Sequence, residues 1–293
     1  IERDKPVIPL DNAAVPHQVA DSVIHSERLS ASLTQSLLRD VHHAFRTEIN
    51  DLLLSALARV ISDWSGNAEI YLELEGHGRE SFSEKIDLSR TVGWFTSVYP
   101  VRLKYENGQS LQDNLKSVKE QLRRIPNKGF GYGALRYLGQ PRQNRLLRQA
   151  PRADIVFNYL GQFDALLENN PWFQLAAEHR GQEHSSGSVD PHPISINSHI
   201  AGDSLQVDWI FSQRQLRLDT VAKLAQQFMA ALEQLIAHCV QPNVFGYTPS
   251  DFPLAGLDQP QLDRLVGTQP NIESVYPLSP MQEGMLFHSL FDN

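Results

Sequence analysis

Residues 69–80 read EIYLELEGHGRE, and this stretch decides which class of fold surrounds it. Its first half alternates, because the apolar Ile70, Leu72 and Leu74 are separated by polar or aromatic residues. Successive side chains of a strand point to opposite faces, so the alternation predicts a half-buried strand over residues 69–75. The rest of the chain supplies the neighbours that such a strand needs.

Helical and strand patterns follow one another along the chain, but not in strict strand–helix–strand order. Apolar alternation and short apolar runs predict further strands over residues 23–29, 96–103, 155–160, 194–200 and 205–211. Apolar residues at helical spacing predict four helices. The first begins at Ser32, which forms a capping box with Gln35, and runs to about Phe45. The others are predicted from Thr47 to Gly66, over 111–122 and over 220–238. Residues 165–192 lack a sustained period and are predicted to form a long loop. We therefore expect an α/β fold of the α+β kind, with a mixed sheet and helices packed on it.

Composition and charge exclude several classes of protein. Of 293 residues, 41% are hydrophobic and 20% are charged, which is ordinary for a soluble globular protein. The net charge of −8 argues against a nucleic-acid partner, because phosphate binding needs a basic surface. Cys239 is the only cysteine, so we expect a reducing compartment and a cytoplasmic location. No apolar run reaches the roughly 18 residues of a membrane span, so no membrane association is expected.

The chain divides into three predicted parts. Residues 1–240 hold one folded unit, residues 241–272 are proline-rich with weak periodicity and are predicted to be a linker, and a new element begins in residues 273–293. Ser279 as N-cap, a proline at the first helical position and Gln282 form a capping box for that element. The chain begins without methionine or signal architecture and stops soon after this helix start. We therefore expect both ends to be cuts inside a longer polypeptide.

The run 75–80 joins the end of the predicted strand to a turn. Gly76 and Gly78 lie one residue apart and permit backbone conformations that are closed to other residues. One interpretation is a glycine-rich turn that carries a solvated cluster of charges. The other places the Glu75 carboxylate on a rigid strand end facing a cavity, where it could act as a general base if burial raised its pKa.

Five sequence runs occur in order along the chain. They are residues 75–80 (EGHGRE), 90–101 (RTVGWFTSVYPV), 126–133 (PNKGFGYG), 157–164 (FNYLGQFD) and 192–197 (HPISIN). Four of them are near-complete matches, and the fifth a looser one, to signatures of epimerisation domains in nonribosomal peptide synthetases. Over about residues 1–250, the chain resembles the C-terminal lobe of such a domain.

This resemblance implies a fold and a reaction. Epimerisation domains have the fold of condensation domains and chloramphenicol acetyltransferase, with two lobes around a central tunnel. Their substrate is an aminoacyl or peptidyl thioester on the 4′-phosphopantetheine arm of a carrier domain, here expected upstream in the same polypeptide. The Cα proton is removed and returned, which interconverts L and D residues. The thioester carbonyl acidifies that proton, so no directly bound cofactor is expected.

The resemblance also assigns roles to residues. Glu75 is implied as the acid/base residue of this lobe, and Asn158 and Tyr159 as donors to the enolate oxygen. The alternative for both donors is that they satisfy buried strand backbone. Supporting positions near the site are His77, Arg79, Glu84, Arg90 and Trp94. An ion pair that orders the loop is the favoured interpretation for Glu84 and Arg90. For Trp94, a place in the core is favoured over a contact role.

One departure from the family pattern separates this chain from a complete enzyme. The family's catalytic histidine belongs to a His-His-x-x-x-Asp motif in the N-terminal lobe. His42 and His43 form a histidine pair here, but Thr47 stands where the motif requires aspartate. The pair also falls inside a predicted helix, so we reject it as catalytic. The N-terminal lobe is expected to be missing, which would leave this chain inactive alone.

The start of another domain is implied at the C-terminus. Residues 276–284 (YPLSPMQEG) resemble the opening of a condensation domain, the arrangement expected where an epimerising module passes its product to the next module.

Two rival functions stay open at this stage. The first is a condensation domain that forms peptide bonds, and the second is a non-catalytic module that positions the carrier domain. Arg142, Arg145 and Arg148 recur along one predicted helix face, where a solvated surface is favoured over docking of an acidic carrier domain. The histidines His184, His192 and His199 lack metal-ligand spacing, so no metal site is expected.

Overall fold

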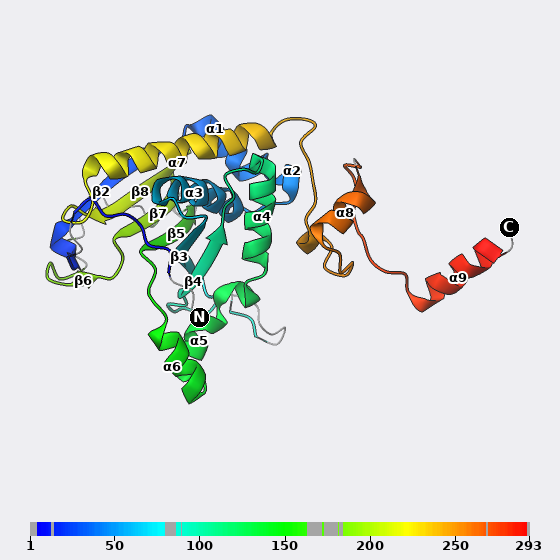
Figure 1. The fold of residues 1–293 in the computed structure, drawn as a ribbon, viewed down its shortest axis with the longest axis horizontal. Helices are drawn as coiled ribbons and strands as arrows, with labels where there is room; N and C mark the ends of the chain where they lie inside the picture. The colour runs from blue at the N-terminus through cyan, green and yellow to red at the C-terminus, as the bar shows by residue number, and fades with distance from the viewer. Residues whose placement is uncertain are drawn as a thin grey trace.

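The computed structural model describes residues 5–12, 15–79, 86–88, 90–162, 172, 181, 184–267 and 269–291. At its centre is a six-stranded mixed sheet in the order β2-β8-β7-β5-β3-β4 (Figure 1). The strands are β2 (Ser22–Arg28), β3 (Glu69–Gly76), β4 (Ser97–Lys104), β5 (Ile155–Gln162), β7 (Ile194–Ala201) and β8 (Ser204–Ser212). Strand β5 runs parallel to both β3 and β7, and the outer pairs are antiparallel. This confirms the mixed sheet expected from the sequence.

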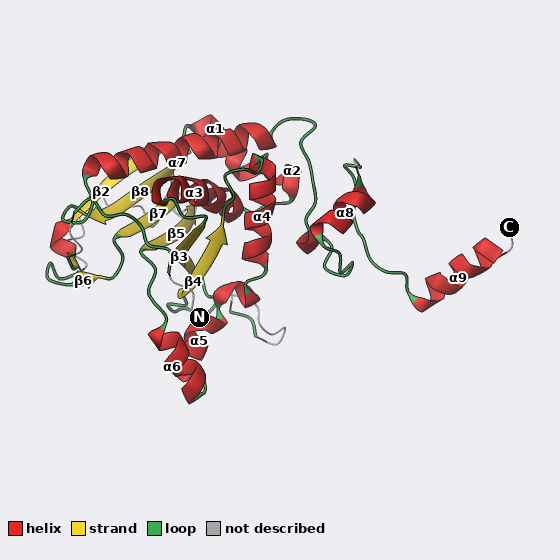
Figure 2. Cartoon of the chain, viewed as in Figure 1, coloured by secondary structure: helices red, strands yellow, loops and turns green. Residues whose placement is uncertain are grey.

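Helices and short elements complete the chain (Figure 2). The α-helices are α1 (Ala31–Arg39), α2 (His42–Phe45), α3 (Ile49–Ser65), α4 (Leu111–Arg123), α5 (Gly131–Leu138), α6 (Pro141–Gln149), α7 (Leu218–Cys239), α8 (Gln259–Val266) and α9 (Pro280–Phe291). The described residues also form the 3₁₀ turns η1 (Val19–Asp21), η2 (Pro126–Gly129) and η4 (Pro249–Asp251), and β1 (His17–Gln18) pairs with β6 (Val189–Asp190). Among the residues described, no helix is both long enough and apolar enough to cross a membrane.

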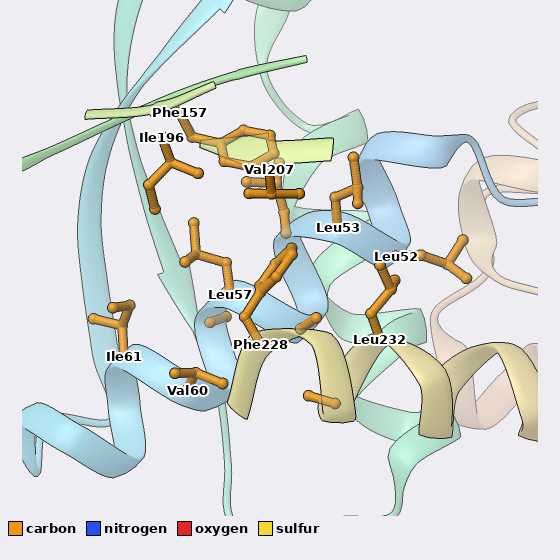
Figure 3. Close-up of a cluster of buried hydrophobic side chains, with 14 of the residues drawn as sticks. Leu52, Leu53, Leu57, Val60, Ile61, Phe157, Ile196, Val207, Phe228 and Leu232 are labelled. Atoms are coloured by element: carbon orange, nitrogen blue, oxygen red, sulfur yellow. The ribbon is translucent and has the colours of Figure 1, made fainter. Parts of the chain in front are cut away.

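The core lies between the sheet and the helices α3 and α7. Leu53 and Leu57 of α3 meet Phe228 of α7, and Phe157 and Val207 reach them from the sheet (Figure 3). All five side chains are buried, and burial of each contributes about 1.5–3 kcal/mol relative to exposure. Because the apolar residues of β3 face this layer, its alternate residues, Glu73 and Glu75 among them, face away from the core.

The segment predicted as one helix from Ser32 to Phe45 is divided, which corrects that prediction. Helix α1 is capped by Ser30, whose side chain accepts the Leu33 N–H at 3.4 Å. The chain turns after Arg39 and continues as the short α2. Val41 lies in this turn and Phe45 ends α2, and both are fully buried, so the turn brings both into the core. A left-handed Arg46, with φ of 50°, ends α2.

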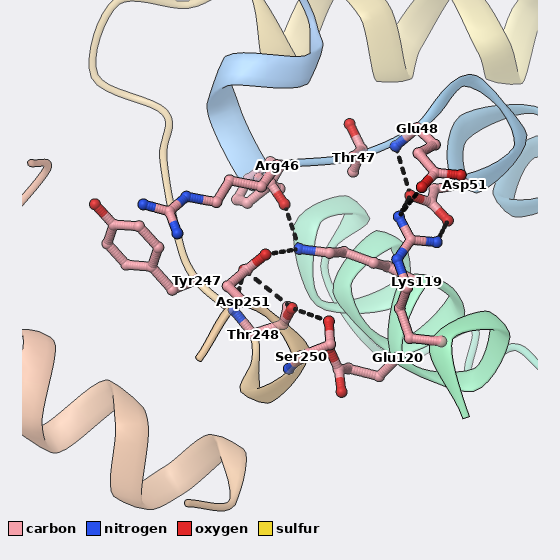
Figure 4. A network of polar contacts seen from close by, with 12 residues as sticks. Arg46, Thr47, Glu48, Asp51, Lys119, Glu120, Tyr247, Thr248, Ser250 and Asp251 are labelled. Atoms are coloured by element: carbon pink, nitrogen blue, oxygen red, sulfur yellow. Dashed lines mark hydrogen bonds and ion pairs between the residues drawn. The ribbon is translucent and has the colours of Figure 1, made fainter. Parts of the chain in front are cut away.

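The segment 241–272, predicted as a linker, contains η4 and α8 and a small apolar cluster of its own. This cluster consists of Tyr247, Phe252, Leu262 and Val266. The segment is also held to the sheet-bearing unit, since the Lys119 ammonium donates to Asp251 Oδ1 and to the Phe45 carbonyl, both at 2.7 Å (Figure 4). The segment is therefore more structured than its weak periodicity indicated.

Helix α9 begins as the sequence predicts. Gln282 accepts the Ser279 N–H at 2.9 Å, and the Ser279 hydroxyl accepts the Gln282 N–H at 3.4 Å. Figure 1 shows this helix lying apart from the sheet and its covering helices. Its large apolar side chains are exposed, including Met285 and Phe287.

Candidate active site

A pocket of about 440 Å³ opens where β3 ends, beside the middle of β5 and the start of α3. The residues that line it come from β3 and the turn after it, β4, β5, η2 and the residues around the start of α3. They are Glu48, Asn50, Glu75, Gly76, His77, Gly78, Thr96, Ser97, Tyr99, Lys128, Asn158, Tyr159 and Leu160. Glu75, Asn158 and Tyr159, all predicted from the sequence, therefore lie together at one cavity.

Glu75 and Asn158 form a direct pair across neighbouring strands. Strand β3 pairs in parallel with β5, with Leu74 opposite Phe157, so the next residue of each strand projects from the face opposite the core. The Asn158 Nδ2 group donates a hydrogen bond to Glu75 Oε2 at 2.7 Å. This contact fixes the orientation of the carboxylate, and the sequence reasoning did not predict it.

The environment of Glu75 favours its neutral form. Partial burial raises the pKa of this carboxyl above its ordinary value, and the nearby charge of His192 opposes that rise. A carboxyl group with a raised pKa is better suited to accept and return a proton near neutral pH than a solvated one. The structure therefore agrees with a cavity-facing carboxylate rather than a fully solvated cluster of charges.

The turn after Glu75 needs one of its two glycines for conformational reasons. Gly78 has a φ of +65°, and a Cβ atom at this position would overlap the Phe95 carbonyl oxygen. Gly76 remains within strand β3 and has no positive φ. The expected conformational freedom is thus used at Gly78 alone.

Arg79 orders the loop that follows rather than lining the pocket. Its guanidinium donates to the carbonyl groups of Leu88 at 2.8 Å and Gly93 at 3.4 Å. The same group lies over the Phe95 ring, 4.4 Å from the ring centroid. The backbone N–H of Arg79 also donates to His77 Nδ1 at 3.0 Å, which ties this loop to the pocket wall.

The neighbours of Asn158 bear on the two interpretations that the sequence left open. Its backbone carbonyl accepts the Ser198 hydroxyl at 3.0 Å, so strand backbone is satisfied by serine and the Asn158 amide is directed to Glu75. Tyr159 lines the pocket, and burial raises the pKa of its phenol.

Of the remaining supporting positions, one lies elsewhere than expected, one is exposed and one is outside the described residues. Trp94 is 90% exposed, so the expectation of a core tryptophan was wrong. It lies in the segment between β3 and β4, outside the apolar layer that the sheet and helices enclose. Arg90 is exposed at a turn, and Glu84 lies outside the described residues, as does Glu80 of the motif.

Sequence reasoning missed the contribution of η2 to the pocket. Asn127 and Lys128 have positive φ angles of 47° and 49°, and Gly129 follows with 78°. A side chain on Gly129 would overlap the Tyr99 ring, so this glycine lets η2 approach β4. Two consecutive non-glycine residues in the left-handed region are uncommon, and here they place Lys128 on the pocket wall.

The histidine pair and the arginine row lie away from the pocket lining. His42 and His43 lie in α2, and burial lowers the pKa of His42. Arg142, Arg145 and Arg148 are exposed on α6. Within the described part of the chain, no cluster of three or more His, Cys, Asp or Glu residues has the arrangement of a metal site.

The fold and the site define a class of protein. Residues 2–252 match the family described as Condensation domain, and the chain belongs to that family. The domains of this family in nonribosomal peptide synthetases work on substrates that phosphopantetheine carrier domains hold. The fold is the chloramphenicol acetyltransferase-like fold of condensation and epimerisation domains.

Among solved structures, this chain is similar to the epimerization domain from the third module of tyrocidine synthetase B. The TM-score is 0.74 at 36% sequence identity, over 82% of this chain and 53% of that one. The four-domain nonribosomal peptide synthetase AB3403 shares the fold, with a TM-score of 0.58 at 18% identity over 85% of this chain and 20% of that one.

Curated relatives are much longer synthetases. A component of the linear gramicidin synthase of Brevibacillus parabrevis is 46% identical over 264 residues, which cover 90% of this chain and 5% of that protein. Bacitracin synthase 3 of Bacillus licheniformis is 37% identical over 287 residues, which cover 98% of this chain and 4% of that protein. The chain therefore spans a small part of the relatives that it matches.

Proposed function

We propose that this chain forms one side of an epimerisation site acting at Cα of an aminoacyl or peptidyl thioester on a phosphopantetheine arm. The observation that carries the proposal is the Glu75 carboxylate, half-buried at the wall of a cavity and oriented by the Asn158 amide at 2.7 Å. Similarity to a solved epimerization domain supports it as well.

The proposed chemistry needs only a base, an acid and a stabilised oxyanion. The Glu75 carboxylate takes the Cα proton. The electron pair of the C–H bond moves into the Cα–carbonyl bond while the carbonyl π pair moves onto oxygen, which forms a thioester enolate. A proton delivered to the opposite face of Cα reverses the configuration, and Glu75 returns to its starting state when it gives up its proton. Asn158 has a second amide proton free of the Glu75 bond, and Tyr159 has its hydroxyl, so both could donate to the enolate oxygen.

The second acid/base group is proposed to come from an N-terminal lobe, since His42 and His43 do not line this pocket. The same proposal assigns the chain an upstream carrier domain in the same polypeptide, a downstream condensation domain and a cytoplasmic location. The three-part division into residues 1–240, 241–272 and 273–293 is part of it. The reaction uses the acidity that the thioester confers and has no step assigned to a bound organic cofactor.

The test is replacement of Glu75 by Gln in the full synthetase module that contains this chain. We expect loss of D-configured product and loss of exchange of the Cα proton with solvent deuterium. Glu69→Gln is the matched control, because Glu69 lies at the other end of β3 and pairs with Arg102 at 3.5 Å, and it should keep both activities. Undiminished deuterium exchange in Glu75→Gln would refute the assignment.

Condensation is the alternative reaction, since the matched family is described as Condensation domain. Mass analysis of the carrier-bound product separates the two reactions, because condensation lengthens the peptide and epimerisation leaves its mass unchanged. Carrier binding together with normal racemisation in Glu75→Gln would instead indicate a docking role.

A further inference from the structure

His192 lies in an ion-pair network that the proposed reaction does not use. Its Nε2 atom is 3.0 Å from Glu73 Oε2, and its Nδ1 atom is 3.6 Å from Asp190 Oδ1. The backbone N–H of His192 also donates to Asp190 Oδ1 at 2.9 Å. The imidazole therefore has a carboxylate at each nitrogen.

The backbone around His192 is also held in place by contacts with neighbouring segments. The His192 carbonyl accepts the Nδ1–H of His17 at 2.9 Å, and His17 is fully buried. The other nitrogen of His17 is 2.8 Å from the Ser22 hydroxyl at the start of β2. Strand pairing of His17 with Asp190 joins the same two segments again. The proline at position 193 restricts the backbone further.

This network keeps His192 positively charged. Burial alone would lower its pKa, but the two carboxylates outweigh that effect and raise the pKa of His192 to about 9. Although burial acts in the opposite direction, the same contacts hold the pKa values of Glu73 and Asp190 below their ordinary range. At pH 7 the network thus contains a cation between two anions.

The network lies next to the reactive carboxylate. Glu73 and Glu75 are two positions apart on β3, so both side chains project from the same face of the sheet. His192 lies two residues before the start of β7, and it contacts Glu73 of β3 although β5 stands between these two strands in the sheet. His192 is also the charged neighbour whose field opposes the effect of burial on Glu75.

We propose that His192 is a positioning residue, a fixed cation that holds Glu75 in its carboxylate form for abstraction of the Cα proton. This inference rests on the proposed epimerisation function. His192 has no place in the pocket lining and acts through Glu75 alone. Its effect is therefore predicted on the pH dependence of the reaction.

Other charged groups near the two residues define the controls. The titratable side chains that share the pocket with Glu75 are Glu48, His77, Tyr99, Lys128 and Tyr159. Those that face His192 are Glu73 from β3, Asp190 from β6 and His17 from β1, with Arg152 acting on Glu73. None of these is changed when His192 alone is substituted.

The experiment measures exchange of the Cα proton with deuterium against pH in the full module, in wild type and in His192→Gln. We expect the acidic limb of the rate, where Glu75 loses its proton, to move up by roughly one pH unit, the lower end of the effect of a neighbouring opposite charge. His192→Lys, which keeps a cation, should restore the wild-type limb. His25→Gln is the matched control, because His25 pairs with Glu27 at 3.1 Å on β2, far from β3 in the strand order.

The variant Glu73→Gln distinguishes an effect of the His192 charge from loss of the contact that holds its ring. It breaks the same 3.0 Å contact as His192→Gln but removes an anion, while Asp190 still holds the imidazole. The acidic limb should therefore not rise.

A rise in both variants, or an unchanged limb in His192→Gln, overturns the inference. If His192→Gln does not fold, His192→Lys and Glu73→Gln decide the same question, since a limb that rises in either contradicts the proposal. Absence of exchange in the wild-type module would instead refute the proposed function.

Discussion

Several lysines form ion pairs with carboxylates in this structure. Among them, replacing Lys119 by Met should lower the stability of the folded chain the most. The Lys119 side chain is 1% exposed, and that of its partner Asp251 is 7% exposed. The ammonium makes two hydrogen bonds of 2.7 Å, one to Asp251 and one to the Phe45 carbonyl. Methionine fills a similar volume but leaves a buried carboxylate and a buried carbonyl without their donor.

The size of the loss follows from these contacts. Removal of one partner from a buried ion pair costs about 3–5 kcal/mol. Asp251 keeps the backbone N–H of Thr248 at 2.8 Å and the Thr248 hydroxyl at 3.1 Å, which places the expected loss near the lower end of that range. Burial lowers the pKa of Lys119, so the wild-type ammonium is itself partly destabilised, which again favours the lower end. We expect about 3 kcal/mol.

The assay is urea unfolding of the chain, followed by tryptophan fluorescence. A loss of about 3 kcal/mol lowers the midpoint by about 1 M if the m value is near ~3 kcal/mol per M. In Lys119→Met with Asp251→Asn, both charges are gone, and much of the stability should return. The control is Lys104→Met, whose exposed pair with Glu106 at 2.9 Å should be dispensable. A loss below ~1 kcal/mol for Lys119→Met, or a double variant as unstable as the sum of its parts, would refute the reasoning.

Two further substitutions test the site. Because burial raises the pKa of Glu75, the acidic limb of Cα proton exchange should lie above the ordinary carboxyl value of about 4.3. Asn158→Ala removes the hydrogen-bond donor that favours the carboxylate form of Glu75. In pH-rate measurements on the full module, it should move the acidic limb to still higher pH, by about one unit. A shift to lower pH would contradict the role of the amide. Gly78→Ala should lower the exchange rate at least 10-fold, because a β-carbon there overlaps Phe95, whereas Gly202→Ala, with a φ of +58° but open space around it, should leave the rate near that of wild type. Equal rates in the two alanine variants would show that steric contact at position 78 does not matter.

Local pattern was sufficient to predict most of the elements and part of the site. Strands β3, β5 and β8 follow from alternation or apolar runs. Their motifs point to Glu75 near the end of β3 and to Asn158 within β5. Their contact does not, because it depends on which strands become neighbours in the sheet, and β5 lies more than 70 residues after β3.

The unpredicted features all depend on contacts between distant segments. His192 has no local signal beyond the loose motif that contains it, since its partner Glu73 lies 119 positions away. The periodicity of segment 241–272 does not reveal that this segment is structured. Part of the reason is that its Asp251 forms a buried ion pair with Lys119, 132 positions away in the sequence. Trp94 was expected in the core from residue type alone, and residue type carries no information on which segments lie outside the packed layers.

The order of strands in the sheet also sets when it can form during synthesis. Strand β2 pairs only with β8 in the six-stranded sheet, and Arg28 meets its partner Gln206 across 178 positions of sequence. At roughly 5–20 residues per second, β2 emerges from the ribosome some 10–40 s before its partner is made. During that interval, the edge-forming groups of β2 and the apolar side of β3 are available to other chains or to chaperones. In a polypeptide that repeats such lobes, we expect this delay to be the step most open to mispairing between copies.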